Sequence, residues 1–364
     1  MRRIAAALGS VAICILITGV LCEASLRIQQ KLGPLYDLKF APEQMAIFPG
    51  LLFSDVVNHV QMPGPDWDEN GVARLNVPNA PDCAPKILFL GDSFMQGYPR
   101  SPNAVPLSVR ASIKEATGRE PCVLNAGQVS YSPSIYTVLA KRLIPLLRPD
   151  IVLIDIDETD LYDENYRYRE LTVRDEAGTA VAVRPTPWIY RYNQAKAVMG
   201  RHWFYIHRLI DRIYIEDRLM PRLVREYNEG REQDIFFAQR LPAAEARAKH
   251  AAELAYFAST LDGLTRTAVE LMGSADRLVY LHHPYLEHLE PAGPAYNDVV
   301  PAIVAAVAAR YGVRFYDATA DMRGAAGSAP ESLYLPDDGH FNDDGYRAYG
   351  VAIAKYLMTM LDAN

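Results

Sequence analysis

Ser93 and His340 are residues whose types and surroundings could perform nucleophilic chemistry together. Ser93 follows an apolar run in a tight Gly-Asp-Ser turn, and His340 stands three residues after Asp337. A serine hydroxyl becomes a good nucleophile when an imidazole takes its proton and an acid orients that imidazole. The sequence therefore predicts Ser93 as nucleophile, His340 as base and Asp337 as the orienting acid.

Two neighbouring aspartates, Asp338 and Asp92, have alternative roles in this site. Asp338 is the alternative orienting acid, although the spacing of three residues to the histidine favours Asp337. Asp92 precedes the serine where the chain is expected to enter a helix, a place where aspartate forms turns or caps helix ends. We therefore expect Asp92 to be structural rather than a reactant.

The catalytic candidates need a scaffold, and the chain offers alternating strands and helices. Five buried strand candidates occur between helical stretches, at Lys86–Leu90, Cys122–Asn125, Asp150–Asp155, Arg277–His282 and Val313–Asp317. Continuous apolar strands separated by helices indicate a parallel sheet covered on both faces. Open α/β sheets carry their active sites at the carboxyl ends of the strands, which is where the Gly-Asp-Ser turn lies.

These motifs resemble those of the SGNH, or GDSL-like, hydrolase superfamily, especially its membrane-anchored bacterial branch linked to exported polysaccharides. The resemblance covers residues 86–160 and 277–360, from Gly91-Asp92-Ser93-Phe94 to the block around Asp337 and His340. It implies a three-layer α/β domain of flavodoxin-like topology. It also implies a serine esterase or O-acyltransferase that acts on acyl, preferably acetyl, esters of a carbohydrate, without a cofactor.

The departures from the family pattern concern the oxyanion hole. The candidate backbone donors are the amide of Ser93 and the loop Asn125–Ser130. The family's oxyanion glycine falls on Ser130, or on Gly127 if the alignment is shifted, and the family's asparagine falls on Thr159. A threonine hydroxyl reaches less far than an amide, and loss of one oxyanion donor can cost about a hundredfold to a thousandfold in turnover.

Acidic and histidine residues near the strand ends allow other readings. The acids Asp155, Asp157, Glu158, Asp160, Asp163 and Glu164 are expected to form a solvated loop, with Asp160 helping to order the site. A cation site or a glycosidase acid pair is the alternative. His282, His283 and His288 lack cysteine or carboxylate partners at metal-ligand spacing, so we expect no metal.

The amino terminus has the pattern of a membrane anchor. Arg2 and Arg3 precede an uncharged run from Ile4 to Cys22, about the 17 to 25 residues needed to cross a bilayer. The positive-inside rule then predicts a single-pass anchor over residues 1–23 in the inner membrane, with the rest in the periplasm or another extracytoplasmic space. A cleaved signal peptide is the competing reading, and a lipid-modified Cys22 is disfavoured by Leu21.

Beyond the anchor we expect a linker or wrapping segment over residues 24–82 and one domain over residues 83–364. An insertion at about 162–239 would hold a hairpin over Glu170–Arg184 and a helical part over Trp188–Tyr227. The aromatics of that helical part could line a groove, dock a partner or simply pack. Ala243–Met272 is predicted to be the helix that returns the chain to the sheet.

Charge and cysteine content bound the partners and the compartment. The formal net charge of -7 and the lack of a long basic run argue against nucleic acid. Cys83 and Cys122 precede or begin adjacent strands and would form either a disulfide or two separate buried thiols. A transferase would need a membrane acyl donor, for which a multispanning protein is the expected partner. The competing class is a non-catalytic binding or scaffolding subunit with the same fold.

Overall fold

The computed structural model describes residues 9–10, 13–14, 16–25, 28, 68, 70–73, 75, 78–97, 103–184, 240–289, 297–336 and 339–361. The chain divides into two compact units, one of Met1–Ser54 with Thr186–Glu232 and one of Asp55–Pro185 with Gln233–Asn364. The second unit holds the sheet and the site. In the first unit, residues 16–25 are helical.

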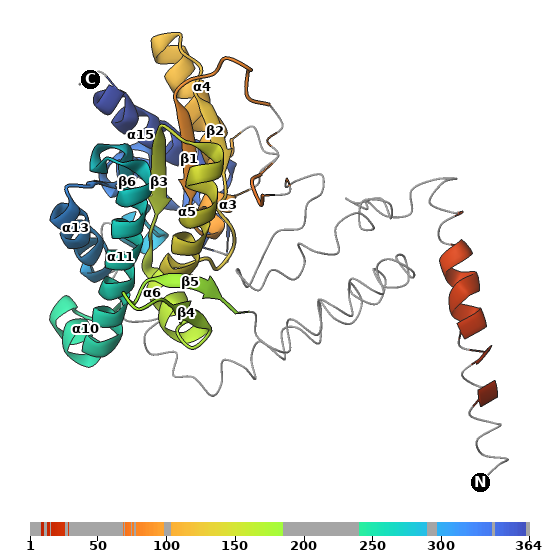
Figure 1. The fold of residues 1–364 in the computed structure, drawn as a ribbon. Coiled ribbons are helices and arrows are strands. Elements are labelled where there is room, and N and C mark those ends of the chain that lie inside the picture. The colour runs from red at the N-terminus through yellow and green to blue at the C-terminus, as the bar shows by residue number, and fades with distance from the viewer. Residues whose placement is uncertain are drawn as a thin grey trace. The chain divides into compact units, whose positions relative to one another are not determined.

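A five-stranded parallel sheet forms the centre of the second unit (Figure 1). Its strands are β1 (Lys86–Leu90), β2 (Cys122–Asn125), β3 (Ile151–Asp155), β6 (Leu278–His282) and β7 (Arg314–Asp317), in the order β2-β1-β3-β6-β7. All four neighbouring pairs are parallel. The predicted strands are confirmed, and three of them start one residue later than expected. The strand order is the doubly wound one, with its switch point between β1 and β3.

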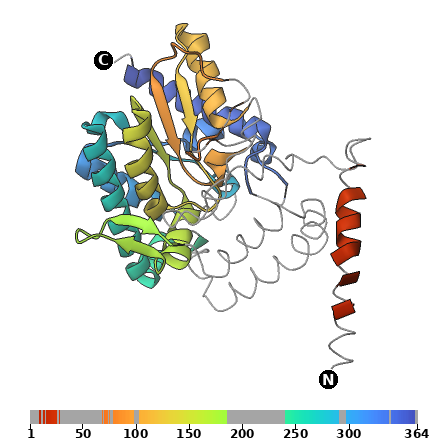
Figure 2. The same cartoon turned by 45° about the vertical axis from the view of Figure 1, so that its right-hand side comes forward.

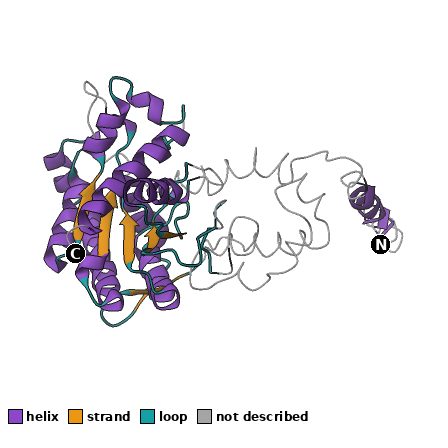
Figure 3. Ribbon diagram, turned by 90° about the horizontal axis from the view of Figure 1, so that it is seen from above, coloured by secondary structure: helices purple, strands orange, loops and turns teal. Residues whose placement is uncertain are grey.

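Helices cover both faces of this sheet, giving the three layers visible in Figures 2 and 3. The face of Leu88 and Leu90 packs against α5 (Pro133–Leu147), α11 (Ala251–Met272) and α13 (Val299–Tyr311). The opposite face, with Ile87 and Phe89, packs against α4 (Val105–Thr117), α14 (Thr319–Ala326) and α15 (Asp343–Leu361). Apolar side chains on both sides of one strand explain its unbroken hydrophobic run.

Shorter elements lie at the strand ends and in the long excursion after β3. They are α3 (Ser93–Gln96), α6 (Glu158–Tyr162), a turn of π-helix (Asp163–Tyr168), α10 (Ala243–Lys249) and α12 (Leu286–Leu289). The predicted hairpin is present as β4 (Thr172–Arg174) and β5 (Ala180–Val183), which pair antiparallel. The predicted return helix is broken at His250 into α10 and α11. The rest of the insertion, including Trp188–Tyr227, lies outside the described residues, as does most of the predicted linker.

Cys83 and Cys122 form a disulfide, with their Cα atoms 5.0 Å apart. Cys122 opens β2, and Cys83 lies three residues before β1, so the bond joins the amino-terminal ends of two neighbouring strands. Of the two alternatives left open by the sequence, the structure has the disulfide. No helix within the described stretches is both long and apolar enough to cross a membrane.

Candidate active site

The nucleophile turn is built by the end of β1 and the start of α3. Asp92 is the residue before α3, and its Oδ1 accepts a hydrogen bond of 2.8 Å from the amide of Phe94. This is the helix-capping role expected from the sequence. Gly91 lies so close to α3 that an added Cβ would come within 2.6 Å of the Met95 Cβ. The turn therefore fixes Ser93 at the carboxyl edge of the sheet.

The structure brings Ser93 and His340 together from positions 247 residues apart. Ser93 Oγ lies 2.8 Å from His340 Nε2, the distance expected between a nucleophile and its base. The Phe94 ring stacks on the His340 ring, with a centroid distance of 4.8 Å. The predicted nucleophile and the predicted base are thus within hydrogen-bond reach, and the Phe94 ring stacks on the base.

A closed turn holds the backbone of His340. Its carbonyl accepts a hydrogen bond of 2.7 Å from the amide of Leu335, and Tyr334 and Phe341 form an antiparallel bridge. Gly339, directly before the histidine, has a φ of 81°, a conformation that favours glycine. Asp337 and Asp338 lie outside the described residues, so the orienting acid stays a prediction.

The loop between β2 and α5 packs against α3. Its two candidate oxyanion residues, Gly127 and Ser130, differ in whether their amides already have an acceptor. The Gly127 amide donates to Asn125 Oδ1 at 2.9 Å, and a Cβ on Gly127 would come within 2.8 Å of the Gln96 amide nitrogen. Gly127 is thus needed for close approach, and its amide is already used. By contrast, no described residue accepts from the amides of Ser93 or Ser130.

Ser130 has a left-handed backbone, with a φ of 58°. Its side-chain oxygen accepts from the Arg167 guanidinium, and its carbonyl accepts from the Tyr168 hydroxyl at 2.6 Å. Left-handed conformations cost a residue with a Cβ more than they cost glycine. The family's glycine, when aligned with Ser130, therefore falls on a position whose backbone suits glycine.

Thr159 directs its hydroxyl toward carboxylates. Its Oγ1 donates to Asp157 Oδ1 at 2.8 Å and lies 3.4 Å from Asp92 Oδ2. A hydroxyl has one proton, and the ionised Asp157 can only accept. Because the contact with Asp157 is the shorter of the two, we assign the Thr159 proton to Asp157.

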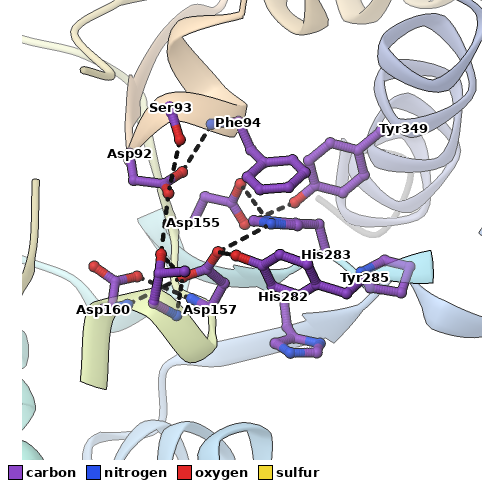
Figure 4. Close-up of polar contacts among 12 residues, drawn as sticks. Asp92, Ser93, Phe94, Asp155, Asp157, Asp160, His282, His283, Tyr285 and Tyr349 are labelled. Carbon is purple, nitrogen blue, oxygen red and sulfur yellow. Dashed lines mark hydrogen bonds and ion pairs between the residues drawn. The ribbon is translucent and has the colours of Figure 1, made fainter. Parts of the chain in front are cut away.

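Behind the nucleophile turn, His283 lies between two carboxylates (Figure 4). Its Nδ1 is 3.0 Å from Asp155 Oδ2 and its Nε2 is 3.2 Å from Asp157 Oδ2. Burial opposes the charge on His283, but the two aspartates outweigh it and raise the pKa of His283 well above its ordinary value. Its ring also contacts the Phe94 ring at 3.9 Å. The ring of Phe94 therefore contacts both the buried His283 and His340.

His282 forms a second such cluster. Its Nε2 lies 3.1 Å from Glu158 Oε1 and its Nδ1 lies 3.4 Å from Asp317 Oδ1. Burial lowers the pKa of His282, but the charge of Glu158 and the bond to Asp317 raise it to about 10. His288 adds a third ring nitrogen, 3.4 Å from the same Glu158 oxygen. In the described part of the chain, no group of such side chains is arranged to hold a metal ion.

The expectation that the acidic segment after β3 is solvated is wrong. All six of its acids are buried, with at most 4% of each exposed: Asp155, Asp157, Glu158, Asp160, Asp163 and Glu164. They are buried because they have partners. Strands β3 and β6 are neighbours, so acids that follow one strand meet the histidines that end the other. The flavodoxin-like topology implied by the resemblance places these two strands side by side, and that adjacency is the signal in the sequence for these pairs.

Glu164 is a buried acid that connects parts of the insertion to the rest of the domain. Its carboxylate accepts from the Ser134 amide and the Ser132 hydroxyl, each at 2.8 Å, and from the Tyr256 hydroxyl at 3.2 Å. Arg174 of the hairpin lies 3.5 Å away. One buried carboxylate therefore joins the start of α5, the hairpin and α11.

Comparisons with known proteins add similarities of fold. No family model matches the chain, and no curated protein matches it. Solved structures that are similar include a two-domain esterase (CEX) active on acetylated mannans, with 14% identity and a TM-score of 0.41 over 76% of this chain and 49% of that one. Others are a lipase/acylhydrolase from Enterococcus faecalis (15%, TM-score 0.40, 76% and 96%) and the acetylxylan esterase Axe2 from Geobacillus stearothermophilus (13%, 0.43, 75% and 94%).

The chain spans about half the length of the first of these structures and nearly all of the other two. Similarities at this level of identity concern the fold alone. The evidence for a chemical role is this chain's own strand order and site geometry. In strand order, and in the places of Ser93 and His340, the chain resembles an SGNH hydrolase.

Proposed function

We propose that this protein is a serine esterase or O-acyltransferase that acts on acetyl esters of an exported carbohydrate. The observation that carries the proposal is the 2.8 Å contact between Ser93 Oγ and His340 Nε2 at the carboxyl edge of a doubly wound sheet. Two amides without described partners, those of Ser93 and Ser130, support it as candidate donors to an oxyanion.

In the proposed reaction, Ser93 Oγ attacks the ester carbonyl while its proton passes to His340. The carbonyl electron pair moves onto oxygen, where the two backbone amides donate hydrogen bonds. The pair then returns, the bond to the sugar oxygen breaks, and His340 gives its proton to that oxygen. Water or a second sugar hydroxyl attacks the acyl-serine in the same way, with His340 again as base and Asp337 as the proposed orienting acid.

The compartment and the substrate class rest on other features. The disulfide between Cys83 and Cys122 is typical of an oxidising compartment, and the sequence pattern over residues 1–23 is that of a membrane anchor. Both support a site outside the inner membrane, where exported carbohydrate is found. If the acyl group is transferred to a sugar, a multispanning membrane protein is the proposed donor.

The test is labelling of the full-length protein with a fluorophosphonate, together with turnover of an acetyl ester such as p-nitrophenyl acetate. We expect Ser93→Ala to abolish labelling and Ser93→Ala and His340→Ala each to lower turnover by at least about a thousandfold. Ser328→Ala, which changes an exposed serine in the turn after α14, should behave as wild type. A folded wild type that neither labels nor turns over would favour the non-catalytic binding subunit.

A second series separates hydrolysis from transfer. The wild type would be given an acetyl donor with and without an unacetylated oligosaccharide, and acetate and acetylated sugar would be quantified. An esterase releases acetate regardless of the sugar, whereas a transferase forms acetylated sugar at the expense of acetate. Neither product should form in Ser93→Ala.

A further inference from the structure

Asp92 has a second carboxyl oxygen that its capping role does not use. While Oδ1 accepts from the Phe94 amide, Oδ2 lies 3.3 Å from Ser93 Oγ (Figure 4). The same Oδ2 lies 3.4 Å from Thr159 Oγ1. The side chain is buried, with 4% of its surface exposed. A buried carboxyl oxygen thus faces two hydroxyl oxygens, one of them the nucleophile.

Each of the two hydroxyls has a shorter contact elsewhere, Ser93 with His340 and Thr159 with Asp157, both at 2.8 Å. Thr159 donates to Asp157, which also accepts a hydrogen bond of 2.6 Å from the Tyr285 hydroxyl. Burial disfavours the charge on Asp157, but the bond to His283 and the charge of His283 outweigh it and keep the pKa of Asp157 below its ordinary value. Ser93 must point its proton at His340 for the base to take it. Each hydroxyl then directs an oxygen lone pair, and not its proton, toward Asp92 Oδ2.

Two lone pairs facing a carboxylate oxygen would repel it, whereas a protonated carboxyl can donate to either of them. The electrostatics of the site agree. Burial raises the pKa of Asp92 well above its ordinary value, and the charges of Asp157 and Asp155 raise it further against the opposing charge of His283 and the Phe94 amide. The titratable groups around Asp92 are Asp155, Asp157, Asp160, Tyr136, His283, Tyr285 and, beyond Ser93, His340.

We propose that Asp92 works as a neutral acid whose Oδ2 hydroxyl donates a hydrogen bond to the oxyanion formed on Ser93. The oxyanion forms one carbon atom away from Ser93 Oγ, so a donor 3.3 Å from Oγ can reach it. Asp92 then supplies the side-chain donor that Thr159, with its proton on Asp157, does not supply. An ionised Asp92 at the same place would oppose the negative charge of the transition state.

This inference rests on the proposed esterase or transferase function, and two variants of Asp92 test it. Asp92→Asn keeps an acceptor for the Phe94 amide and places an NH2 donor where Oδ2 was. Asp92→Ser keeps an oxygen able to cap α3 but has no donor at that reach. Both would be compared with wild type for kcat, KM and pH dependence in the acetyl ester assay, with thermal unfolding as the check on folding.

We expect Asp92→Asn to lose less than about tenfold in kcat and Asp92→Ser to lose about a hundredfold to a thousandfold, with KM nearly unchanged in both. Wild-type kcat should fall as rising pH ionises Asp92, and this alkaline decline should be absent from Asp92→Asn. Asp163→Asn is the control for loss of a buried carboxyl, because burial raises the pKa of Asp163 to about 7, against the charge of Arg167, and its side chain bonds to Ser130 and not to Ser93. It should keep the alkaline decline.

Two outcomes would overturn the inference while leaving the proposed function intact. One is a folded Asp92→Asn as slow as Asp92→Ser, and the other is a folded Asp92→Ser as fast as wild type. A measurement without turnover adds to this. In protein labelled with 13C at the aspartate carboxyls, the Asp92 signal, assigned by its absence from Asp92→Asn, should be that of a neutral carboxyl at pH 7.

An Asp92 carboxyl that is ionised at pH 7 would overturn the inference whatever the activity. A wild type that neither labels nor turns over would instead overturn the proposed function, and the donor role with it. The two failures are therefore told apart by fluorophosphonate labelling of Ser93.

Discussion

At Ser130 the backbone conformation favours glycine, whereas the hydrogen bond of the side chain requires a hydroxyl. Its φ of 58° favours glycine, while its side-chain oxygen accepts a hydrogen bond from Arg167. The left-handed conformation costs a residue with a Cβ roughly 1 kcal/mol or more. The serine therefore has a backbone cost at this position, where its hydrogen bonds connect the loop between β2 and α5 to the π-helical turn after α6.

The two demands can be separated with a pair of variants that both lack the hydroxyl. Ser130→Gly relieves the backbone, whereas Ser130→Ala does not, so we expect Ser130→Gly to be more stable than Ser130→Ala by about 1 kcal/mol. Urea unfolding of the two proteins gives the difference directly. Equal stability would mean that the loop carries no backbone cost at this position.

At the scale of residues, the sequence indicated two side chains that the structure brings into contact, Ser93 and His340, but not their surroundings. Ser93 and His340 were found because a nucleophile after a strand and a histidine before the last helix are short patterns. The contacts of His282 with Glu158 and of His283 with Asp155 were missed because they join residues over 120 positions apart. Local spacing does not show such pairs, and burial of a carboxylate depends on partners that only the assembled sheet provides.

At the scale of elements, the close packing of α4 against α15 requires a residue without a side chain at Gly350. Gly350 of α15 lies against α4, and a Cβ there would come within 2.5 Å of the Ser108 Cβ and 2.8 Å of the Val105 carbonyl oxygen. By contrast, Gly324 of α14 has nothing within 4 Å of such a Cβ. Two helical glycines thus differ only in whether a neighbouring helix approaches them.

This pair predicts opposite effects of the same substitution. Gly350→Ala should lower the free energy of unfolding by about 1–3 kcal/mol, because backbone atoms of α4 must shift. Gly324→Ala should raise it by up to about 1 kcal/mol, because alanine favours a helix where space allows. Denaturant unfolding of both variants is the measurement. A Gly350→Ala protein as stable as Gly324→Ala would show that α4 and α15 are not packed this closely.

The elements themselves were largely predictable. The three central strands, β1, β3 and β6, are apolar runs with side chains buried on both faces, and this pattern gave the centre of the parallel sheet to within one residue. The break between α10 and α11 at His250 was not predicted, since the apolar periodicity that identified the helix continues only from Leu254 onward. Periodicity reports the buried face and says little about where a partly exposed helix bends.

At the scale of the whole molecule, the two buried histidines make stability depend on pH. His282 and His283 link the ends of β6, β3 and β7 through four carboxylates. The pKa of His282 is raised to about 10 in the folded protein, from an ordinary value of about 6.5 in the unfolded chain. The folded state therefore holds the proton more tightly than the unfolded state does.

The sign of the pH effect follows from linkage. The stabilising contribution of His282 is fully present below about pH 6.5 and is lost as the pH rises toward about 10. We expect the wild-type free energy of unfolding to fall by a few kcal/mol across this range, and the fall to be smaller in His282→Gln. Urea titrations at several pH values give both slopes. Identical slopes would show that His282 is not charged in the folded protein.

The disulfide should stabilise the whole second unit without acting on the site. It closes a loop with a sequence separation of 39, for which chain entropy predicts about 4 kcal/mol of stabilisation. Cys83 and Cys122 lie at the amino-terminal ends of their strands, and Ser93 lies beyond the carboxyl end of β1. We therefore expect Cys83→Ala with Cys122→Ala to lower the free energy of unfolding by about that amount in urea. The matched control, Cys14→Ala with Cys22→Ala, removes two free cysteines and should leave it unchanged.

In the disulfide variant, the rate of Ser93 labelling should stay unchanged although the free energy of unfolding falls. Because the bond and the nucleophile are at opposite ends of the strands, the disulfide variant should label at Ser93 as fast as wild type at temperatures where both are folded. Slower labelling of a fully folded variant would mean that the amino-terminal ends of β1 and β2 determine the position of Ser93. In that case the sheet would transmit strain along its strands, as close-packed interiors can. A uniform labelling rate would instead locate the control of Ser93 in the residues at its own end of the sheet, among them Asp92, Phe94 and His340.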